Sequence, residues 1–344
     1  MRWENLETEA ERRARLPGIG EPVVRTFDAP EALGIRFHEV QARSAINAVP
    51  ERSRMPFRFT INPYRGCTHA CVYCFARPTH TYLDLNARED FEREIVVKVN
   101  VPELVRAELG RRSWGGDHVA LGTNTDPYQW VESRYRLTRG VWEAMRDFSN
   151  PCSVLTKSPL LLRDVDVFKE LVARTEFVAN LSIPTIDEKA WRATEPHTPH
   201  PRKRLEAVAE LVREGIPTGV LVAPLMPGIN DSPEQVEEIL ELAGEAGARS
   251  IGGIGLHLRG EVREIWFDWL RQYRPDLLDN YERLYTRGAY LPKVEAKRLS
   301  DLVAKGRKRS VRSMRGRNVG SGSRRARTGD DAATAQPLKQ PSLF

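Results

Sequence analysis

The chain has 344 residues, of which 40% are hydrophobic and 29% are charged, a composition typical of soluble globular proteins. No apolar run approaches the 18 or more residues of a membrane span, and the N-terminal residues lack the apolar core of a signal peptide. Length and composition therefore exclude membrane and secreted classes, and they predict a cytoplasmic protein with a sizeable buried core.

The net charge of +6 is unevenly distributed along the chain. Residues 305–344 carry eleven Lys and Arg against two Asp, which leaves 42 basic and 45 acidic residues in the rest of the chain. The body is therefore mildly acidic, and a solvated C-terminal arm supplies the positive charge.

Residues 1–50 form a polar and charged N-terminal extension, with a first helix predicted to end near Pro17. From residue 51 to residue 260, short apolar runs alternate with amphipathic segments. Six of the apolar runs are typical of strands buried on both faces of a parallel sheet. They are Phe57–Asn62, His118–Leu121, Ser153–Thr156, Phe177–Ile183, Thr218–Ala223 and Ser250–Ile254.

Helices are predicted between these strands. Asn100–Glu103 and Ser232–Gln235 both match the capping-box pattern, with proline tolerated in the first turn. Successive β–α units of this kind predict an α/β fold, either a parallel barrel or a large part of one. The segments with apolar residues at helical spacing are Thr138–Phe148, Asp164–Ala173, Arg202–Arg213 and Val236–Ala246.

Residues 261–305 are predicted to form C-terminal helices that cap the core with Trp266, Phe267 and Trp269. Residues 306–344 are rich in Ser, Gly and Arg and poor in apolar residues, which predicts a disordered basic tail. The helical segments are Glu261–Tyr273, Asp276–Tyr285 and Lys293–Lys305.

Three of the four cysteines, Cys67, Cys71 and Cys74, follow the first strand with the spacing C-x3-C-x2-C. In a cytoplasmic protein such a cluster is expected to hold metal rather than disulfides. The carboxyl end of a barrel strand is also where active-site loops lie. Three thiolates on one loop can hold three irons of a cubane cluster and leave the fourth iron open for a small molecule.

Structural zinc is the alternative, with His69 or His80 as the fourth ligand. The absence of a second cysteine pair and the strand-loop-helix setting disfavour zinc.

Two stretches around the cysteines, Asn62–Cys67 (Asn-Pro-Tyr-Arg-Gly-Cys) and Tyr73–Arg77 (Tyr-Cys-Phe-Ala-Arg), carry a family resemblance. The spacing resembles the C-x3-C-x-aromatic-C signature of the radical S-adenosylmethionine (SAM) superfamily, with Tyr73 as the aromatic residue. The flanking residues are similar to the spore photoproduct lyase-like branch, and the resemblance covers roughly residues 35–260.

This resemblance implies a partial (β/α)6 barrel of the radical SAM type, with a 4Fe-4S cluster on Cys67, Cys71 and Cys74 and SAM on the open iron. Once an external electron donor has reduced the cluster, SAM is expected to be cleaved to a 5′-deoxyadenosyl radical that abstracts hydrogen from a substrate.

The resemblance also implies cofactor-binding residues near the strand ends. Asn124, Thr125 and Asp126 follow the second strand and are expected, with Tyr73, to contact SAM. A simpler role for Asp126 is to cap the turn that follows it. Lys157 after the third strand can pair with the SAM carboxylate, or it can be a solvated lysine.

Ser182, near the end of the fourth strand, matches the small polar residue that meets the SAM ribose in this superfamily, although a satisfied core hydroxyl is nearly as good an interpretation. The loop that follows carries Glu195, His197 and His200, to which the sequence assigns no role. No catalytic residue is identified.

One departure from the family concerns radical quenching. Spore photoproduct lyases quench the product radical with a cysteine on the segment after the second strand, whereas this chain has Thr123–Asp126 there, without cysteine. Cys152 begins the third strand, at the opposite end of the barrel, and is interpreted as a buried structural thiol. Thymine-dimer reversal by the same mechanism is therefore not expected, and the fate of a substrate radical stays open.

The basic tail suggests partners. Residues 305–327 carry ten Lys and Arg and no acidic residue, which favours contact with nucleic acid phosphates, although such a tail can also serve only solubility. The last five residues resemble the bacterial sliding-clamp peptide Q-x-S/D-L-F, with Pro341 as a departure. Gln340, Ser342, Leu343 and Phe344 would dock on the clamp.

The sequence thus predicts a radical SAM enzyme that acts on or near nucleic acid, in DNA damage processing. An alternative is radical SAM modification of RNA or protein. A third hypothesis is a non-catalytic iron–sulfur factor that binds DNA or the sliding clamp.

Overall fold

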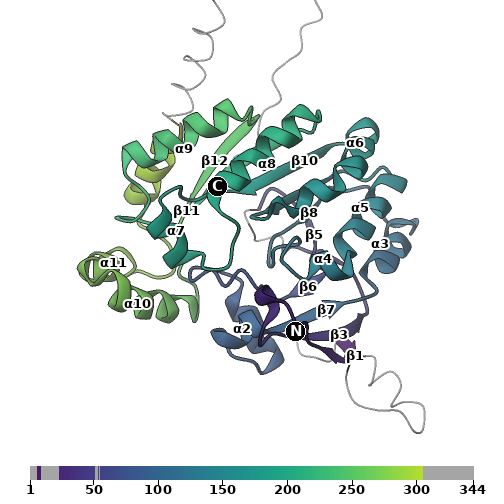
Figure 1. Ribbon diagram of the computed structural model, residues 1–344, viewed down its shortest axis with the longest axis horizontal. Coiled ribbons are helices and arrows are strands. Elements are labelled where there is room, and N and C mark those ends of the chain that lie inside the picture. The colour runs from purple at the N-terminus through teal and green to yellow at the C-terminus, as the bar shows by residue number, and fades with distance from the viewer. Residues whose placement is uncertain (1–5, 9–22, 51–52, 54, 305–344) are drawn as a thin grey trace, which may run out of the picture.

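The computed structural model describes residues 6–8, 23–50, 53 and 55–304, and its largest element is a curved seven-stranded sheet (Figure 1). The strand order is β12-β11-β10-β9-β8-β5-β4, in which the first six strands are parallel and β4 is antiparallel at one edge. This confirms the partial (β/α)6 barrel. The strands are β4 (Ile46–Ala48), β5 (Phe59–Ile61), β8 (Val119–Leu121), β9 (Cys152–Thr156), β10 (Phe177–Ser182), β11 (Thr218–Leu225) and β12 (Ser250–Gly255).

Helices cover the outer face of this sheet in chain order (Figure 1). Each buries one apolar stripe against the strands, as Val141, Trp142 and Met145 do in α5. The main ones are α3 (Val101–Leu109), α5 (Leu137–Asp147), α6 (Val165–Arg174), α8 (Pro201–Arg213) and α9 (Pro233–Glu245). Two short helices, α4 (Glu132–Tyr135) and α7 (Glu188–Thr194), lie in the loops at the carboxyl ends of the strands.

The two predicted capping boxes differ in outcome. Ser232 caps α9 as predicted, because its hydroxyl accepts a hydrogen bond from the backbone N–H of Gln235 at 3.2 Å. Asn100 precedes α3 but does not cap it. Its side-chain amide instead binds the backbone N–H and C=O of Ala42, at 2.8 and 2.9 Å. The pairing of β3 with β7 ends at Val40, so on that side Ala42 has no strand partner in the described part of the chain.

A second, five-stranded sheet, which the sequence did not predict, lies beside the barrel. Its order is β1-β3-β7-β6, with β2 paired to β3. It joins the N-terminal extension to the residues on both sides of the cysteine loop. The strands are β1 (Leu6–Thr8), β2 (Val24–Arg25), β3 (Arg36–Ala42), β6 (Tyr64–Arg65) and β7 (Glu94–Lys98). The helix predicted to end near Pro17 lies outside the described residues.

The C-terminal part of the described chain folds as predicted into helices. These are α10 (Val262–Tyr273), α11 (Leu278–Leu284) and a helix over residues 293–304. Trp266, Phe267 and Trp269 are buried as expected, in an apolar cluster that also contains Cys71 and Tyr73. The C-terminal helices therefore pack directly against the cysteine loop.

None of the helices within the described ranges combines the length and apolar character needed to cross a bilayer. Residues 305–344, which carry the predicted nucleic acid and clamp contacts, lie outside the described part of the chain.

Candidate functional site

The cysteine loop leaves β5 at its carboxyl end and carries the three clustered thiols. Cys67 and Cys71 are buried and Cys74 is half-buried, and all three thiols are free. Burial and then the neighbouring Cys67 raise the pKa of Cys74. The pKa of Cys71 is raised by burial first, with contributions from Glu195 and the other two thiols. Two tight turns keep the three cysteines in one short loop, since Ala70 N donates to Cys67 O at 3.3 Å and Cys74 N donates to Cys71 O at 3.2 Å.

Backbone contacts fix the start of this loop. The backbone N–H of Cys67 donates to Phe91 O at 2.9 Å. Gly66 lies just before it with φ of +83°, and a Cβ at that position would approach Phe91 O to 2.9 Å, so both conformation and space require glycine. Gln129 bridges the same turn, since its side-chain amide accepts from Thr68 N at 3.0 Å and donates to Gly66 O at 3.1 Å.

Arg77 holds the other end of the loop from inside the protein. Its buried guanidinium donates to Cys71 O at 2.9 Å and to Ala70 O at 3.0 Å. The same side chain donates to the carbonyls of Ala87 and Arg88 at 3.2 and 2.9 Å. Arg77 therefore connects the cysteine loop to the segment before helix α2 (Glu89–Arg93), where it also pairs with a glutamate.

Asp126 lies in the loop that follows β8, the second strand of the barrel. Its carboxylate accepts hydrogen bonds from Thr156 Oγ1 at 2.5 Å and from the backbone N–H of Lys157 at 2.7 Å. It also accepts from Tyr128 N at 2.9 Å, which is the turn-capping contact named as the simpler role. His69 Nδ1 lies 3.4 Å away. Asp126 therefore connects β8, β9 and the cysteine loop.

The two residues before Asp126 differ in exposure. Asn124 is exposed, and its backbone N–H donates to Asn62 Oδ1 at 3.3 Å. Thr125 is buried, and its hydroxyl donates to Tyr64 O at 3.4 Å. Of this segment, Asn124 is the residue whose side chain reaches solvent at the end of the barrel.

Lys157 and Ser182 meet at the ends of β9 and β10. Lys157 Nζ lies 2.7 Å from Ser182 Oγ, and it lies 5.6 Å from the centre of the Tyr73 ring. The structure thus brings three of the predicted cofactor residues together, one from the cysteine loop and one from each of two strands. Lys157 is also not a freely solvated lysine, because its ammonium pairs with Glu195 at 2.8 Å.

Glu195 is the residue at this site that sequence reasoning missed. It is fully buried, and its carboxylate contacts Lys157, Tyr73 and Arg204. Burial favours the neutral acid, but Arg204 and then Lys157 outweigh it and lower the pKa of Glu195 to about 2. The available signal was an acidic residue nine positions before an arginine at the start of a helix, which does not specify such a contact.

The two histidines considered as a fourth zinc ligand have other partners. His80 Nε2 is hydrogen-bonded to Glu94 O at 2.9 Å, and its ring packs against Phe91. Burial opposes protonation of His69, yet Asp126 and then Cys67 raise its pKa to about 10. Among the side chains that the structure describes, no three His, Cys, Asp or Glu residues are arranged to hold a single metal ion.

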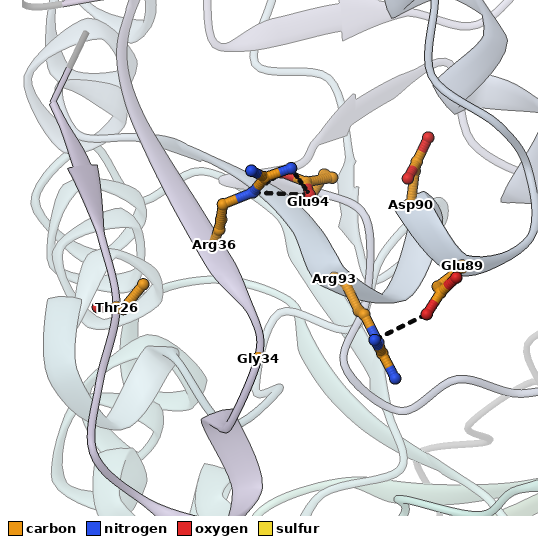
Figure 2. Close-up of a pocket in the computed structure, with 7 residues that line it drawn as sticks. All are labelled: Thr26, Gly34, Arg36, Glu89, Asp90, Arg93 and Glu94. Carbon is orange, nitrogen blue, oxygen red and sulfur yellow. Dashed lines mark hydrogen bonds and ion pairs between the residues drawn. The ribbon is translucent and has the colours of Figure 1, made fainter.

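A separate hollow of about 410 Å³ opens between the N-terminal sheet and α2 (Figure 2). Its charges are mostly paired within the hollow, since Arg36 binds Glu94 at 2.9 Å and Arg93 binds Glu89 at 2.7 Å. We assign it no ligand. It is lined by Thr26, Gly34, Arg36, Glu89, Asp90, Arg93 and Glu94.

Comparison with known proteins finds relatives by sequence and by fold. The chain is 43% identical over 290 residues to uncharacterized proteins of Mycobacterium bovis and Mycobacterium tuberculosis, covering 84% of this chain and 85% of theirs. It is 28% identical over 171 residues to the radical SAM Nalpha-GlyT isomerase of Pseudomonas phage M6, covering 48% of this chain and 33% of that protein.

Among solved structures, the fold is similar to spore photoproduct lyase complexed with dinucleoside spore photoproduct. The TM-score is 0.60 and the identity 16%, over 79% of each chain. A variant of that lyase with bound AdoMet and the same dinucleoside gives a TM-score of 0.61 at 15% identity, over 79% of this chain and 78% of that one. The sequence profile of the radical SAM superfamily matches residues 61–257, a span that contains the cysteine loop and the five barrel strands that follow β5. The chain therefore belongs to the radical SAM superfamily.

Proposed function

We propose that this protein holds a 4Fe-4S cluster on Cys67, Cys71 and Cys74 and cleaves SAM reductively. The observation that carries the proposal is the grouping of three free thiols on one loop beyond the carboxyl end of β5, with Lys157 Nζ 5.6 Å from the ring of Tyr73 in that loop. Three thiolates suit three irons of such a cluster. When bound, the cluster supplies the electron, received from an external donor, with which SAM yields a 5′-deoxyadenosyl radical.

The side chains around the loop suit the polar groups of SAM. Lys157 has three N–H donors, and Ser182 and Glu195 use two of them, so one remains for the SAM carboxylate. Ser182 Oγ accepts from Lys157 and donates to Ala223 O at 3.1 Å, which leaves it one lone pair for a ribose hydroxyl.

In the loop that follows β8, the exposed side chain of Asn124 offers an amide oxygen for the SAM ammonium group, while Thr125 and Asp126 hold the loop through their own hydrogen bonds. Tyr73 contributes its ring at the cysteine loop.

We further propose that the substrate is nucleic acid, in DNA damage processing. The fold similarity to spore photoproduct lyase supports this substrate class. The ten basic residues within 305–327 support it as well, since Lys and Arg in such a tail can pair with nucleic acid phosphates. The terminal peptide Gln340–Phe344 would bring the enzyme to DNA by way of the sliding clamp.

The reaction itself is expected to differ from that of spore photoproduct lyase. Thr123 begins the segment Thr123–Asp126 that follows β8, and its hydroxyl is buried without a hydrogen-bond partner among the described residues. No thiol occurs in Thr123–Asp126 to return a hydrogen atom to a product radical. We therefore propose a reaction on nucleic acid other than thymine-dimer reversal by that route.

The test uses full-length protein reconstituted anaerobically, reduced with dithionite and mixed with SAM, with 5′-deoxyadenosine as the measured product. Cys71→Ala is the blank. We expect product from the wild type alone, and more product when irradiated DNA is added than when undamaged DNA, RNA or protein is added.

Two results would contradict parts of this proposal. Stimulation by RNA or protein but not by DNA would overturn the substrate class. Absence of product with every substrate, despite a full cluster, would overturn SAM cleavage and favour a non-catalytic iron–sulfur factor.

A further inference from the structure

Glu195 occupies a position that the superfamily membership does not explain. Its side chain is completely buried, and donors surround both carboxylate oxygens. Oε1 accepts from Lys157 Nζ at 2.8 Å and from the hydroxyl of Tyr73. Oε2 accepts from Arg204 Nη2 at 2.6 Å, with Thr198 Oγ1 at 3.3 Å. A carboxylate with its acceptor sites filled in this way has no capacity left to bind a substrate itself.

The partners of Glu195 come from separate parts of the fold. Tyr73 belongs to the cysteine loop, Lys157 follows β9, and Arg204 lies in α8 and donates to Ser182 O at 2.9 Å. The backbone carries the same connection, since Val72 N donates to Thr194 O at 3.0 Å. Glu195 therefore fixes the cysteine loop relative to the strand ends that carry Lys157 and Ser182.

The charges at this point do not cancel within the protein. Lys157 and Arg204 provide two positive charges against the single negative charge of Glu195, all of them buried or nearly so. The surplus suits an anionic group, and the carboxylate of SAM is one. Without Glu195, two cations would repel each other in a poorly solvated site, and Lys157 would be driven from its place toward solvent.

The charge of Glu195 also lies close to the cysteine loop. Tyr73, whose hydroxyl donates to the Glu195 carboxylate, and Val72, whose backbone N–H donates to Thr194 O at 3.0 Å, both lie between Cys71 and Cys74. A negative charge beside the loop disfavours an added electron on a cluster that the loop holds.

We propose that Glu195 is a positioning residue. Glu195 holds Lys157 in place to bind the SAM carboxylate, and its negative charge lowers the reduction potential of the cluster. This inference rests on the proposed function, because it requires a cluster and SAM at this site.

The experiment compares the wild type with Glu195→Gln, each reconstituted anaerobically at full length. Iron content, the dissociation constant for SAM and the midpoint potential of the cluster are measured. We expect Glu195→Gln to keep its iron, to bind SAM about tenfold more weakly, and to have a higher midpoint potential. Glu188→Gln is the matched control, because Glu188 lies exposed on α7 in a surface pair with Arg192, and it should change none of the three quantities.

A double-variant cycle distinguishes positioning from a general loss of structure. Lys157→Met alone should weaken SAM binding, and adding Glu195→Gln to it should weaken binding by less than a further twofold, because Glu195 acts through Lys157. Fully additive losses, or an unchanged SAM affinity in an iron-loaded Glu195→Gln protein, would overturn the inference.

If Glu195→Gln cannot hold iron, Tyr73→Phe provides the test. It removes only the hydroxyl that contacts Glu195 and keeps the ring, so SAM binding should weaken about threefold. Unchanged binding in Tyr73→Phe would then overturn the inference. A wild-type protein with a full cluster that does not bind SAM would overturn the proposed function as well, so the two failures are distinguishable.

Discussion

Substituting Arg77 by lysine should damage the cysteine loop even when no metal is present. The guanidinium donates to four backbone carbonyls, those of Cys71, Ala70, Ala87 and Arg88. Lysine keeps the charge but presents it at a single nitrogen, which cannot reach both groups of acceptors. At about 1.5–3 kcal/mol for each hydrogen bond to a charged group, the loss of two bonds should lower the free energy of unfolding by about 3–6 kcal/mol.

The assay is urea unfolding of the apoprotein with its thiols reduced, followed by measurement of iron after reconstitution. Arg77→Lys should unfold at lower urea and take up less iron than the wild type. Arg93→Lys is the control, because Arg93 makes an exposed pair with Glu89 one turn away, and its loss should change stability by less than about 0.5 kcal/mol. If Arg77→Lys matches this control in both stability and iron uptake, the buried hydrogen bonds do not hold the loop.

Three further predictions concern other parts of the chain. Burial, and then Arg65, lower the pKa of Lys98 to about 8 from 10.5, so the unfolded chain binds more protons between these values and wild-type stability should rise with pH there. Lys98→Met should therefore unfold with a free energy about 2 kcal/mol higher than the wild type at pH 7, once the loss of the hydrogen bond from Lys98 to Asn62 O is subtracted. Urea titrations should show that this difference vanishes by pH 10.5. Cys152→Ala should keep full iron content and lose only about 1–2 kcal/mol, because this thiol is buried and burial alone raises its pKa; loss of iron would place it at the cluster. Deleting Gln340–Phe344 should abolish binding to a bacterial sliding clamp in a surface-immobilised assay, and an unchanged affinity would refute the clamp peptide.

The barrel could be predicted from sequence because each of its strands is a short apolar run. The six predicted runs match β5, β8, β9, β10, β11 and β12 to within two residues at either end. A strand that is buried on both faces of a sheet is apolar along its whole length, so its composition alone predicts it. The cysteine loop could be predicted as well, since the spacing of its cysteines is a local pattern.

The N-terminal sheet was missed for the opposite reason. β3 lies in a polar segment and is stabilised by parallel pairing with β7, more than fifty residues later. β7 itself is an apolar run, Ile95–Val97, but the chain around it is occupied by the loop and α2, so no β–α alternation marked it. Long-range pairing of this kind leaves little trace in local sequence.

The site shows the same division between local and distant information. Lys157 and Ser182 were predicted from their place at strand ends, and the structure brings them within 2.7 Å of each other. Glu195 was seen and given no role, because its partners lie 122 residues before it and 9 residues after it in sequence. Only the folded arrangement of the cysteine loop and α8 reveals what its charge contacts.

The cysteine loop is shaped mainly by protein atoms, through contacts such as Cys67 N with Phe91 O and Thr68 N with Gln129 Oε1. In this it differs from a zinc finger, whose site forms only when metal is present. Because these contacts involve no metal, they remain when the proposed cluster is removed, and the same folded chain is expected to accept iron and sulfide again.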